Sequence, residues 1–190
     1  DVYKRQALNI YRNKNFKLKI LDIGTGSGCI AVSLAKEFKN ASITAIDISK
    51  EALEVAEKNL KIHNCYNQIQ LKMIDFKKIN SKFDLIVSNP PYLSNEQFNN
   101  ADPEVKNFEP KLALVGGDDG LKFYREYSNN LKNLMNKSAY FICEIGNNQR
   151  QGCEEIFISP IFNTKSHTEK EGRGLAFYRS LMHKYSKQIK

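Results

Sequence analysis

Three glycines that alternate with small polar residues form the most informative short pattern in this chain. Residues 21–28 read L-D-I-G-T-G-S-G, with glycines at positions 24, 26 and 28. Glycine lets a backbone turn tightly and brings N–H groups close to a ligand where a Cβ atom would clash. A dinucleotide-binding G-x-G-x-x-G loop would need glycine at position 29, where this chain has Cys29. The pattern therefore predicts a ligand-binding loop of another kind, with a tight turn without a ligand as the alternative.

Acidic residues stand where two further strands are expected to end. Asp47 closes an apolar run, and a carboxylate at that place can accept two hydrogen bonds from a ribose diol. Its alternative role is to cap the next helix, although Ser49 could cap that helix alone. Asp75 and Phe76 follow the third expected strand. For Phe76, contact with a ligand and burial in the core both remain open.

The sequence Asn89-Pro90-Pro91-Tyr92 follows a fourth apolar run, at the place where an open α/β sheet binds its ligands. Two consecutive prolines fix their φ angles and lack N–H donors, so the Pro90 carbonyl is held rigidly and is free to accept. With the Asn89 side-chain oxygen it offers two acceptors to one –NH2 group, and Tyr92 can stack on a planar group. The motif predicts a site for an amide or an exocyclic amine, with a rigid proline turn as the alternative.

Short apolar runs that alternate with helical patterns must position these motifs. We expect strands at 17–23, 42–46, 69–73, 83–88 and 139–145, with two more near 163–167 and 175–180. Helices are expected at 29–38, 50–63, 120–135 and 148–157, and 89–119 is expected to be a long proline-rich loop. This alternation predicts an α/β fold with a mainly parallel sheet. Residues 1–16 have little periodicity and are expected to be a linker or fragment edge before one domain at 17–190.

Taken together, these motifs resemble the class I S-adenosylmethionine-dependent methyltransferases. The resemblance implies a doubly wound, mainly parallel, seven-stranded sheet of Rossmann-like type, and S-adenosyl-L-methionine as the cofactor. It implies that the cofactor contacts Asp22, Gly24, Thr25, Gly26, Ser27, Gly28, Asp47, Asp75, Phe76 and Asn89. Transfer of a sulfonium methyl is an in-line displacement that needs alignment and a dry approach more than a strong base. The lack of a His or Cys catalytic constellation is consistent with such chemistry.

The residues after the N-P-P-Y motif are similar to the protein N5-glutamine methyltransferases that modify peptide chain release factors. The similar segments are F-E-P at 108–110, L-A-L at 112–114, G-G at 116–117, D-G-L at 119–121, F-Y-R at 123–125 and F-I-C-E-I-G at 141–146, followed by Gln149. The resemblance implies methyl transfer to the glutamine of the G-G-Q motif in class I release factors. It further implies catalytic roles for Asn89, Pro90 and Tyr92, and substrate contacts by Asn89, Pro90, Pro91, Tyr92 and Glu109.

Members of that family carry an N-terminal helical domain and an R-P-x-T-E segment ahead of the first strand, and neither is found in this sequence. The chain is therefore expected to be the catalytic domain alone, and an inactive cofactor-binding fragment is one alternative. A methyltransferase that acts on adenine N6 in RNA or DNA is another, because it would share the N-P-P-Y motif. DNA enzymes that flip a base usually add a target-recognition domain, for which 190 residues leave no room.

Composition limits the remaining classes of function. The net charge of +8 comes mostly from lysines spread along the chain, so a nucleic-acid partner is possible but not favoured over a compositional bias. Four cysteines without C-x-x-C spacing and three scattered histidines predict reduced thiols and no metal site. No apolar run approaches the ~18 residues of a membrane span, so we expect no membrane partner and a cytoplasmic location. The sequence leaves the oligomeric state open.

Overall fold

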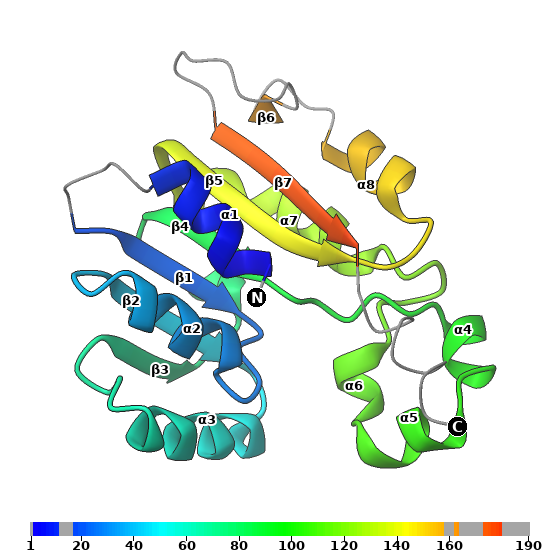
Figure 1. Cartoon of the computed structure of the whole chain (residues 1–190). Coiled ribbons are helices and arrows are strands. Elements are labelled where there is room, and N and C mark those ends of the chain that lie inside the picture. Colours follow the sequence, from blue (N-terminus) through cyan, green and yellow to red (C-terminus); the bar gives the residue numbers. More distant parts are fainter. Residues whose placement is uncertain (1, 12–16, 158–161, 164–172, 180–190) are drawn as a thin grey trace.

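A parallel seven-stranded sheet forms the centre of the computed structural model of this chain (Figure 1). The structure describes residues 2–11, 17–157, 162–163 and 173–179. The strand order is β3-β2-β1-β4-β5-β7-β6, and every neighbouring pair is parallel. The strands are β1 (Lys19–Ile23), β2 (Ser42–Asp47), β3 (Ile69–Met73), β4 (Phe83–Ser88), β5 (Met135–Ile145), β6 (Phe162–Asn163) and β7 (Arg173–Arg179). The expected α/β fold with a parallel sheet is confirmed.

Helices cover both faces of the sheet, because successive residues of a strand point to opposite sides. On one face, α2 (Cys29–Glu37) and α3 (Lys50–Ile62) pack on a cluster that includes Ile20 and Leu85. On the other face, α7 (Lys122–Leu134) and α8 (Arg150–Phe157) pack on a cluster that includes Leu21 and Ile86. Every residue of β4 except Asp84 is buried, as expected for a parallel strand covered on both faces. The sheet is doubly wound, as the resemblance implied.

The direction of the sheet reverses between β1 and β4. From β1 the chain continues outward through β2 and β3, whereas β4 and β5 extend the sheet on the opposite side of β1. Open α/β sheets bind ligands outside the carboxyl ends of their strands at such a point. In the register of this pair, Ile23 at the end of β1 lies opposite Ser88 at the end of β4. The glycine-rich loop and the N-P-P-Y motif therefore leave the sheet from neighbouring positions.

Residues 2–11 form helix α1 (Val2–Tyr11), which differs from the linker expected over 1–16. Ala7 and Tyr11 are both buried in the core beside β1 and α2. The Tyr11 hydroxyl donates to the backbone carbonyl of Asp84 at 2.5 Å, and its ring packs edge-on against Tyr140. The linker prediction does not hold for residues 2–11, because Ala7 and Tyr11 are the only two buried apolar positions among the described side chains of this ten-residue helix, too few to produce a clear period in the sequence. Residues 12–16 lie outside the described residues.

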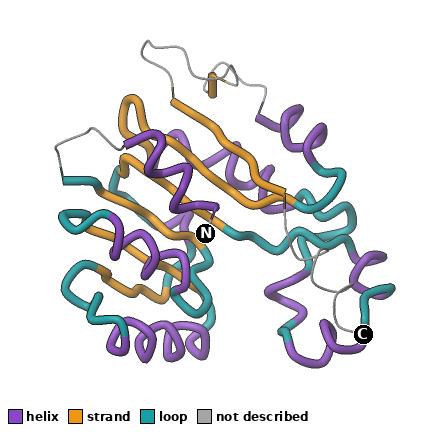
Figure 2. Tube along the Cα trace, in the orientation of Figure 1, coloured by secondary structure: helices purple, strands orange, loops and turns teal. Residues whose placement is uncertain are grey.

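The proline-rich segment between β4 and α7 contains three short helices and is not the continuous loop that was expected. These are α4 (Asn95–Asn99), α5 (Pro103–Phe108) and α6 (Lys111–Leu114). Pro103 opens α5 and Pro110 precedes α6, at positions where a helix does not need the missing N–H donor. Figures 1 and 2 show the three helices as a lobe beside the sheet, on the side to which the strands' carboxyl ends point. We call residues 93–121 the lobe.

Boundaries differ from expectation mainly around β5 and the C-terminal strands. The strand expected at 139–145 already begins at Met135, and its register against β4 shifts between Phe83 and Leu85. Ser138 has a φ of 60°, a conformation that accompanies such an irregularity and leaves no mark in hydrophobic spacing. The strands expected near 163–167 and 175–180 correspond to β6 and β7. Residues 164–172 and 180–190 lie outside the described residues.

Candidate functional site

The glycine-rich loop follows β1 and leads directly into α2. Gly24 and Gly26 have φ values of 68° and 55°, in the left-handed region that favours glycine. A Cβ atom at either position would meet nothing within 4 Å, so the outer side of the loop is open. Gly28 serves packing instead, because a Cβ atom there would lie 3.3 Å from the Ala56 Cβ of α3. The first two glycines therefore leave room for a ligand, and the third brings the loop close to α3.

Two hydrogen bonds hold the loop against its neighbours. The Thr25 N–H donates to the Ile46 carbonyl of β2 at 2.9 Å. The Asn59 side-chain amide of α3 donates to the Ser27 carbonyl, also at 2.9 Å. The backbone of the loop is thus fixed before any ligand binds, which reduces the entropy that binding must overcome.

Asp22 lies at the base of this loop and is fully buried. The Thr25 hydroxyl donates to its Oδ2 at 2.7 Å, whereas Oδ1 makes no hydrogen bond with any described residue. Burial raises the pKa of Asp22 from 3.8 to about 7, and the hydrogen bond from Thr25 partly opposes this shift. A buried acceptor without a partner is costly, so the carboxylate is suited to a ligand that brings a donor or a positive charge.

Asp47 ends β2 and uses both of its carboxylate oxygens within the site. Oδ2 accepts from the Gly26 N–H at 2.9 Å, and Oδ1 accepts from the Ser49 N–H at 3.0 Å. Ser49 is the N-cap of α3, since its side chain accepts from the Ala52 N–H. The capping role considered for Asp47 therefore belongs to Ser49. Asp47 is half-buried beside the open side of the glycine loop, and each oxygen keeps a second lone pair for a ligand hydroxyl.

The next two predicted cofactor residues, Asp75 and Phe76, have different surroundings. Asp75 is half-buried, and its Oδ1 accepts from the Lys77 N–H at 2.9 Å at the start of the short 3-10 helix η1 (Phe76–Lys78). Phe76 is only 6% exposed and packs edge-on against Tyr127 with ring centroids 5.2 Å apart. The structure thus favours the core alternative for Phe76.

Sequence reasoning missed an exposed apolar pair at this edge. Ile48 directly follows Asp47 and is 62% exposed, and Met73, which lies opposite Asp47 in the register of β2 and β3, is 64% exposed. The sequence does contain a sign of this pair, because Ile48 is an aliphatic residue at a position where a polar turn is expected after Asp47. Two exposed apolar side chains beside a carboxylate offer a surface for a flat, mostly apolar ring.

The N-P-P-Y motif leaves β4 beside the glycine loop. Asn89 is exposed, Pro90 is buried, and Pro91 and Tyr92 are half-buried. Just before it, the buried Ser88 hydroxyl donates to the Ile23 carbonyl at 2.9 Å and lies 2.8 Å from the Tyr127 hydroxyl. This contact joins the ends of β1 and β4, so the two loops start from a fixed relative position.

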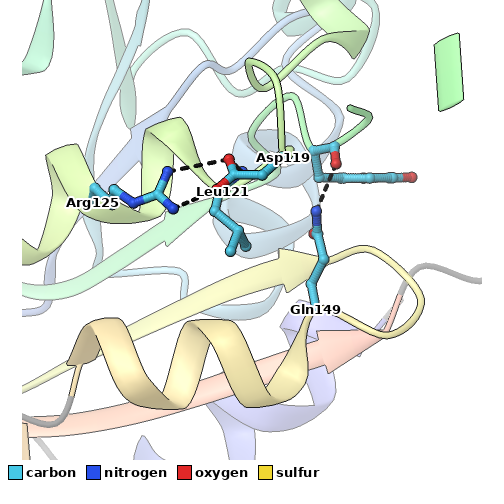
Figure 3. Close-up of polar contacts among 5 residues, drawn as sticks. Asp119, Leu121, Arg125 and Gln149 are labelled. Carbon is cyan, nitrogen blue, oxygen red and sulfur yellow. Dashed lines mark hydrogen bonds and ion pairs between the residues drawn. The ribbon is translucent and has the colours of Figure 1, made fainter. Parts of the chain in front are cut away.

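The far end of the motif is held by the lobe and by the end of β5. Two backbone hydrogen bonds tie Leu93, the residue after the motif, to the end of the lobe. The Leu93 N–H donates to the Leu114 carbonyl, and the Leu93 carbonyl accepts from the Gly116 N–H, each at 2.9 Å. The Gln149 side chain donates to the Tyr92 carbonyl at 2.8 Å (Figure 3). The motif therefore has supports on both sides, although its Asn89 side chain remains accessible.

Glu109, a predicted substrate contact, lies in the lobe. It is exposed and is the C-cap of α5. No group of three or more His, Cys, Asp or Glu side chains in the described part of the chain could hold a metal ion. Likewise, none of the described helices is both long and apolar enough to cross a membrane.

The doubly wound sheet, with the glycine loop at its switch point and the N-P-P-Y motif beside it, defines a Rossmann-like α/β fold. A family model described as the methyltransferase small domain matches residues 7–104. This chain belongs to that family.

Named relatives and a solved structure agree with this assignment. The chain is 42% identical over 144 residues to a release factor glutamine methyltransferase of Bacillus cereus, covering 74% of this chain and 50% of the relative. It is 41% identical over 168 residues to one of Streptococcus pneumoniae, covering 88% and 60%. A ribosomal protein L11 methylase structure from Lactobacillus delbrueckii subsp. bulgaricus aligns with a TM-score of 0.55 at 25% identity, covering 81% and 64%. The chain spans about half the length of the curated relatives it matches.

Proposed function

We propose that this chain is the catalytic part of an enzyme that transfers a methyl group from S-adenosyl-L-methionine to the side-chain amide nitrogen of a glutamine in a peptide chain release factor. The observation that carries the proposal is the register of β1 and β4, which places the glycine loop and Asn89 on adjacent strand ends. A methyl donor on one loop and an amide on the other would then lie close together. The names of the relatives at 42% and 41% identity supply the substrate.

The residues of the first loop fit this cofactor. The open side of Gly24 and Gly26 admits a ligand close to the backbone. The unpartnered Oδ1 of Asp22 suits the ammonium group of the amino-acid end. The remaining lone pairs of Asp47 suit a ribose diol, and Asp75 and Ile48 border the place for a purine ring. Cofactor contacts by these residues, together with Thr25, Ser27, Gly28 and Asn89, are part of the proposal, whereas Phe76 is assigned to the core.

The second loop would hold the substrate amide. When bound, S-adenosyl-L-methionine supplies an electrophilic methyl on a sulfonium. The Asn89 side-chain oxygen and the Pro90 carbonyl would each accept a hydrogen bond from one N–H group of the glutamine amide. These two bonds would orient the lone pair of the amide nitrogen towards the methyl group. Transfer would form a nitrogen–carbon bond as the sulfur–carbon bond breaks, which would leave a neutral thioether, and one amide proton would pass from the nitrogen to solvent water. The chain's contribution is alignment, because the attacking amide and the methyl must be in line.

The charge of the lobe supports a protein substrate over a nucleic acid. Although the whole chain carries +8, the lobe beside the N-P-P-Y motif exposes more acidic than basic side chains. Its exposed acids are Glu96, Asp102, Glu104, Glu109, Asp118 and Asp119, against the basic Lys106 and Lys111. Phosphates brought to this edge would meet like charge, whereas a protein loop with basic residues would be attracted. Glu109 belongs to this surface, as a proposed substrate contact.

Transfer of radiolabelled methyl tests the proposal directly. The chain is incubated with labelled S-adenosyl-L-methionine and a release factor, a G-G-A variant of that factor, bulk RNA or DNA. Label on the wild-type factor and none on the G-G-A variant is the expected result. Label on RNA or DNA would replace it with the nucleic-acid alternative. Bound cofactor with no label on any substrate would leave a cofactor-binding fragment without activity. We further propose a cytoplasmic location, since the substrate is a translation factor.

A further inference from the structure

Three segments that are distant in the sequence meet at the last residue of the N-P-P-Y motif. They are Tyr92 itself, Gly120 of the lobe, and the turn after β5 that contains Gly146 and Gln149. The two glycines permit close approach. A Cβ atom at Gly120 would lie 2.3 Å from the Tyr92 carbonyl oxygen and 2.5 Å from the Gln149 side-chain nitrogen. A Cβ atom at Gly146 would lie 2.9 Å from the Gln149 side-chain oxygen and 3.1 Å from the Tyr92 ring.

Gln149 uses both ends of its side-chain amide in this contact. Its Oε1 accepts from the Gly146 N–H at 2.9 Å, and its Nε2 donates to the Tyr92 carbonyl at 2.8 Å (Figure 3). The residue is 9% exposed, and its bond to the Gly146 N–H is buried while its bond to the Tyr92 carbonyl is partly buried. Loss of such a bond costs part of the desolvation of the partner that is left without it. The side chain therefore links the end of β5 firmly to the motif.

On the opposite side of Gly120, Asp119 and Arg125 fix the same stretch of backbone. Asp119 Oδ1 accepts from the Leu121 N–H at 3.0 Å and from the Arg125 guanidinium at 3.1 Å, as Figure 3 shows. The Arg125 guanidinium holds the pKa of Asp119 down to about 2, so this carboxylate is charged at neutral pH. Gly120 is thus held in place beside the Tyr92 carbonyl, and Gln149 adds a hydrogen bond to that carbonyl from a separate segment of the chain.

We infer that Gln149 is a positioning residue for methyl transfer, which sets the Asn89–Tyr92 loop through the Tyr92 carbonyl. This inference rests on the proposed function. Its side-chain hydrogen bond to this loop is made with a backbone atom, the carbonyl oxygen of Tyr92. Because Asn89 and Tyr92 are held at opposite ends of one rigid proline pair, a shift of Tyr92 also displaces the acceptors at Asn89 and Pro90. Misplacement of a nucleophile by about 1 Å can cost on the order of a hundredfold in rate.

The substitution Gln149→Glu tests this role, because it keeps the size and the acceptor for the Gly146 N–H but removes the donor to Tyr92. We expect kcat to fall about tenfold or more, with little change in cofactor affinity. The ratio of variant to wild-type kcat is expected to rise as pH falls, since a protonated carboxyl can again donate. Tyr92, Asp119 and Glu144 are other titratable residues near this position, and both proteins contain them. The ratio of the two kcat values at each pH therefore isolates the effect of the substituted side chain. Gln151→Asn, at an exposed position in the first turn of α8, two residues after Gln149, is the control and should retain wild-type kcat.

Amide hydrogen exchange gives a second measurement that needs no substrate. In Gln149→Glu, the Leu93 and Gly116 amides are expected to exchange about tenfold faster, while amides of β1 and β4 keep their protection. Unchanged exchange of Leu93 and Gly116, or a kcat equal to that of the control, would overturn the positioning role. If wild-type protein labels no release factor, the proposed function fails, whereas the exchange measurement still decides whether Gln149 holds this loop.

Discussion

At the scale of single residues, the site has two groups of side chains with different tasks. Asp22 and Asp47 are built into the glycine loop by hydrogen bonds from Thr25 and Gly26. Asn89 is exposed at the end of a rigid proline pair, where its oxygen can accept from a substrate. The first group is therefore expected to control cofactor affinity, and Asn89 the rate of transfer.

The substitution Asn89→Ala is expected to lower kcat by about a hundredfold or more, because the lost acceptor orients the attacking nitrogen. The affinity for S-adenosyl-L-methionine, measured by calorimetric titration, should change little, because the proposed contacts of the glycine loop and Asp47 with the cofactor remain. Kinetics of methyl transfer to the release factor provide the comparison. Near-normal turnover would remove Asn89 from its proposed role.

The substitution Asp47→Ala is expected to weaken cofactor binding by about 1.5–3 kcal/mol, the value of a hydrogen bond to a charged group. Ser49→Ala is the matched control, because it removes the cap of α3 and leaves the carboxylate in place. The control should lower the free energy of unfolding by about 1 kcal/mol and leave cofactor affinity unchanged. Equal cofactor affinity in both variants would show that Asp47 only supports the loop.

Asp22 is expected to make stability depend on pH. Because burial raises the pKa of its carboxyl from 3.8 to about 7, the folded protein binds a proton that the unfolded chain releases within this interval. The contribution of Asp22 to stability is thus present below about pH 4 and is lost as pH rises towards 7. Asp22→Asn removes this dependence, so its unfolding free energy relative to the wild type should increase over the interval and then level off. Urea unfolding of the cofactor-free protein at several pH values measures it, and a constant difference would contradict the assignment.

At the scale of elements, the site depends on how helices fix the loops that leave the sheet. α3 contacts the glycine loop through Gly28 and Asn59, and α7 reaches the end of β4 through the Tyr127 hydroxyl. α8 begins just after Gln149, so its first turn lies next to the N-P-P-Y motif. Each motif therefore relies on an element from another part of the chain.

Helix α1 packs on the sheet through Tyr11, although the sequence did not predict a helix there. Tyr11→Ala would leave a cavity beside Tyr140 and remove the bond to the Asp84 carbonyl, so the free energy of unfolding should fall by about 3 kcal/mol or more. Tyr11→Phe keeps the ring and should lose only about 1 kcal/mol. Urea unfolding of both variants measures the two free energies of unfolding and checks that Tyr11→Ala loses more than Tyr11→Phe. A Tyr11→Ala protein as stable as the wild type would mean that α1 does not pack on the sheet.

At the scale of the whole molecule, charge is unevenly distributed. The chain carries +8, yet the lobe at the substrate edge exposes mainly acidic residues. The net positive charge is therefore carried by residues outside the lobe. Polyanions are expected to be attracted to those residues more than to the lobe.

Bulk RNA is accordingly expected to bind without being methylated. The binding should be weak and should fall by about an order of magnitude or more between 50 and 200 mM salt, as for contacts with phosphates alone. Fluorescence anisotropy of labelled RNA at several salt concentrations measures this, in parallel with the methyl-transfer assay. RNA binding that resists salt and is accompanied by label on the RNA would favour a nucleic-acid substrate.

Much of this protein follows from local sequence. Strands β3 and β4 lie where the apolar runs predicted them, and the glycine loop and N-P-P-Y motif follow β1 and β4 as expected. These features are readable because each depends on a few consecutive residues: alternating strand hydrophobicity, glycines at left-handed φ, and a proline pair.

Tertiary structure alone decided the rest. The packing of Phe76 against Tyr127 and the bond from Gln149 to the Tyr92 carbonyl join residues from different elements. The burial of the unpartnered Asp22 oxygen likewise depends on the elements that surround it. The sequence by itself determined which chemistry-bearing residues the chain has and the strand each one follows. Which of them meet, and which are buried, depends on the register of the parallel strands and on helix packing, contacts between distant segments that leave no local pattern in the sequence.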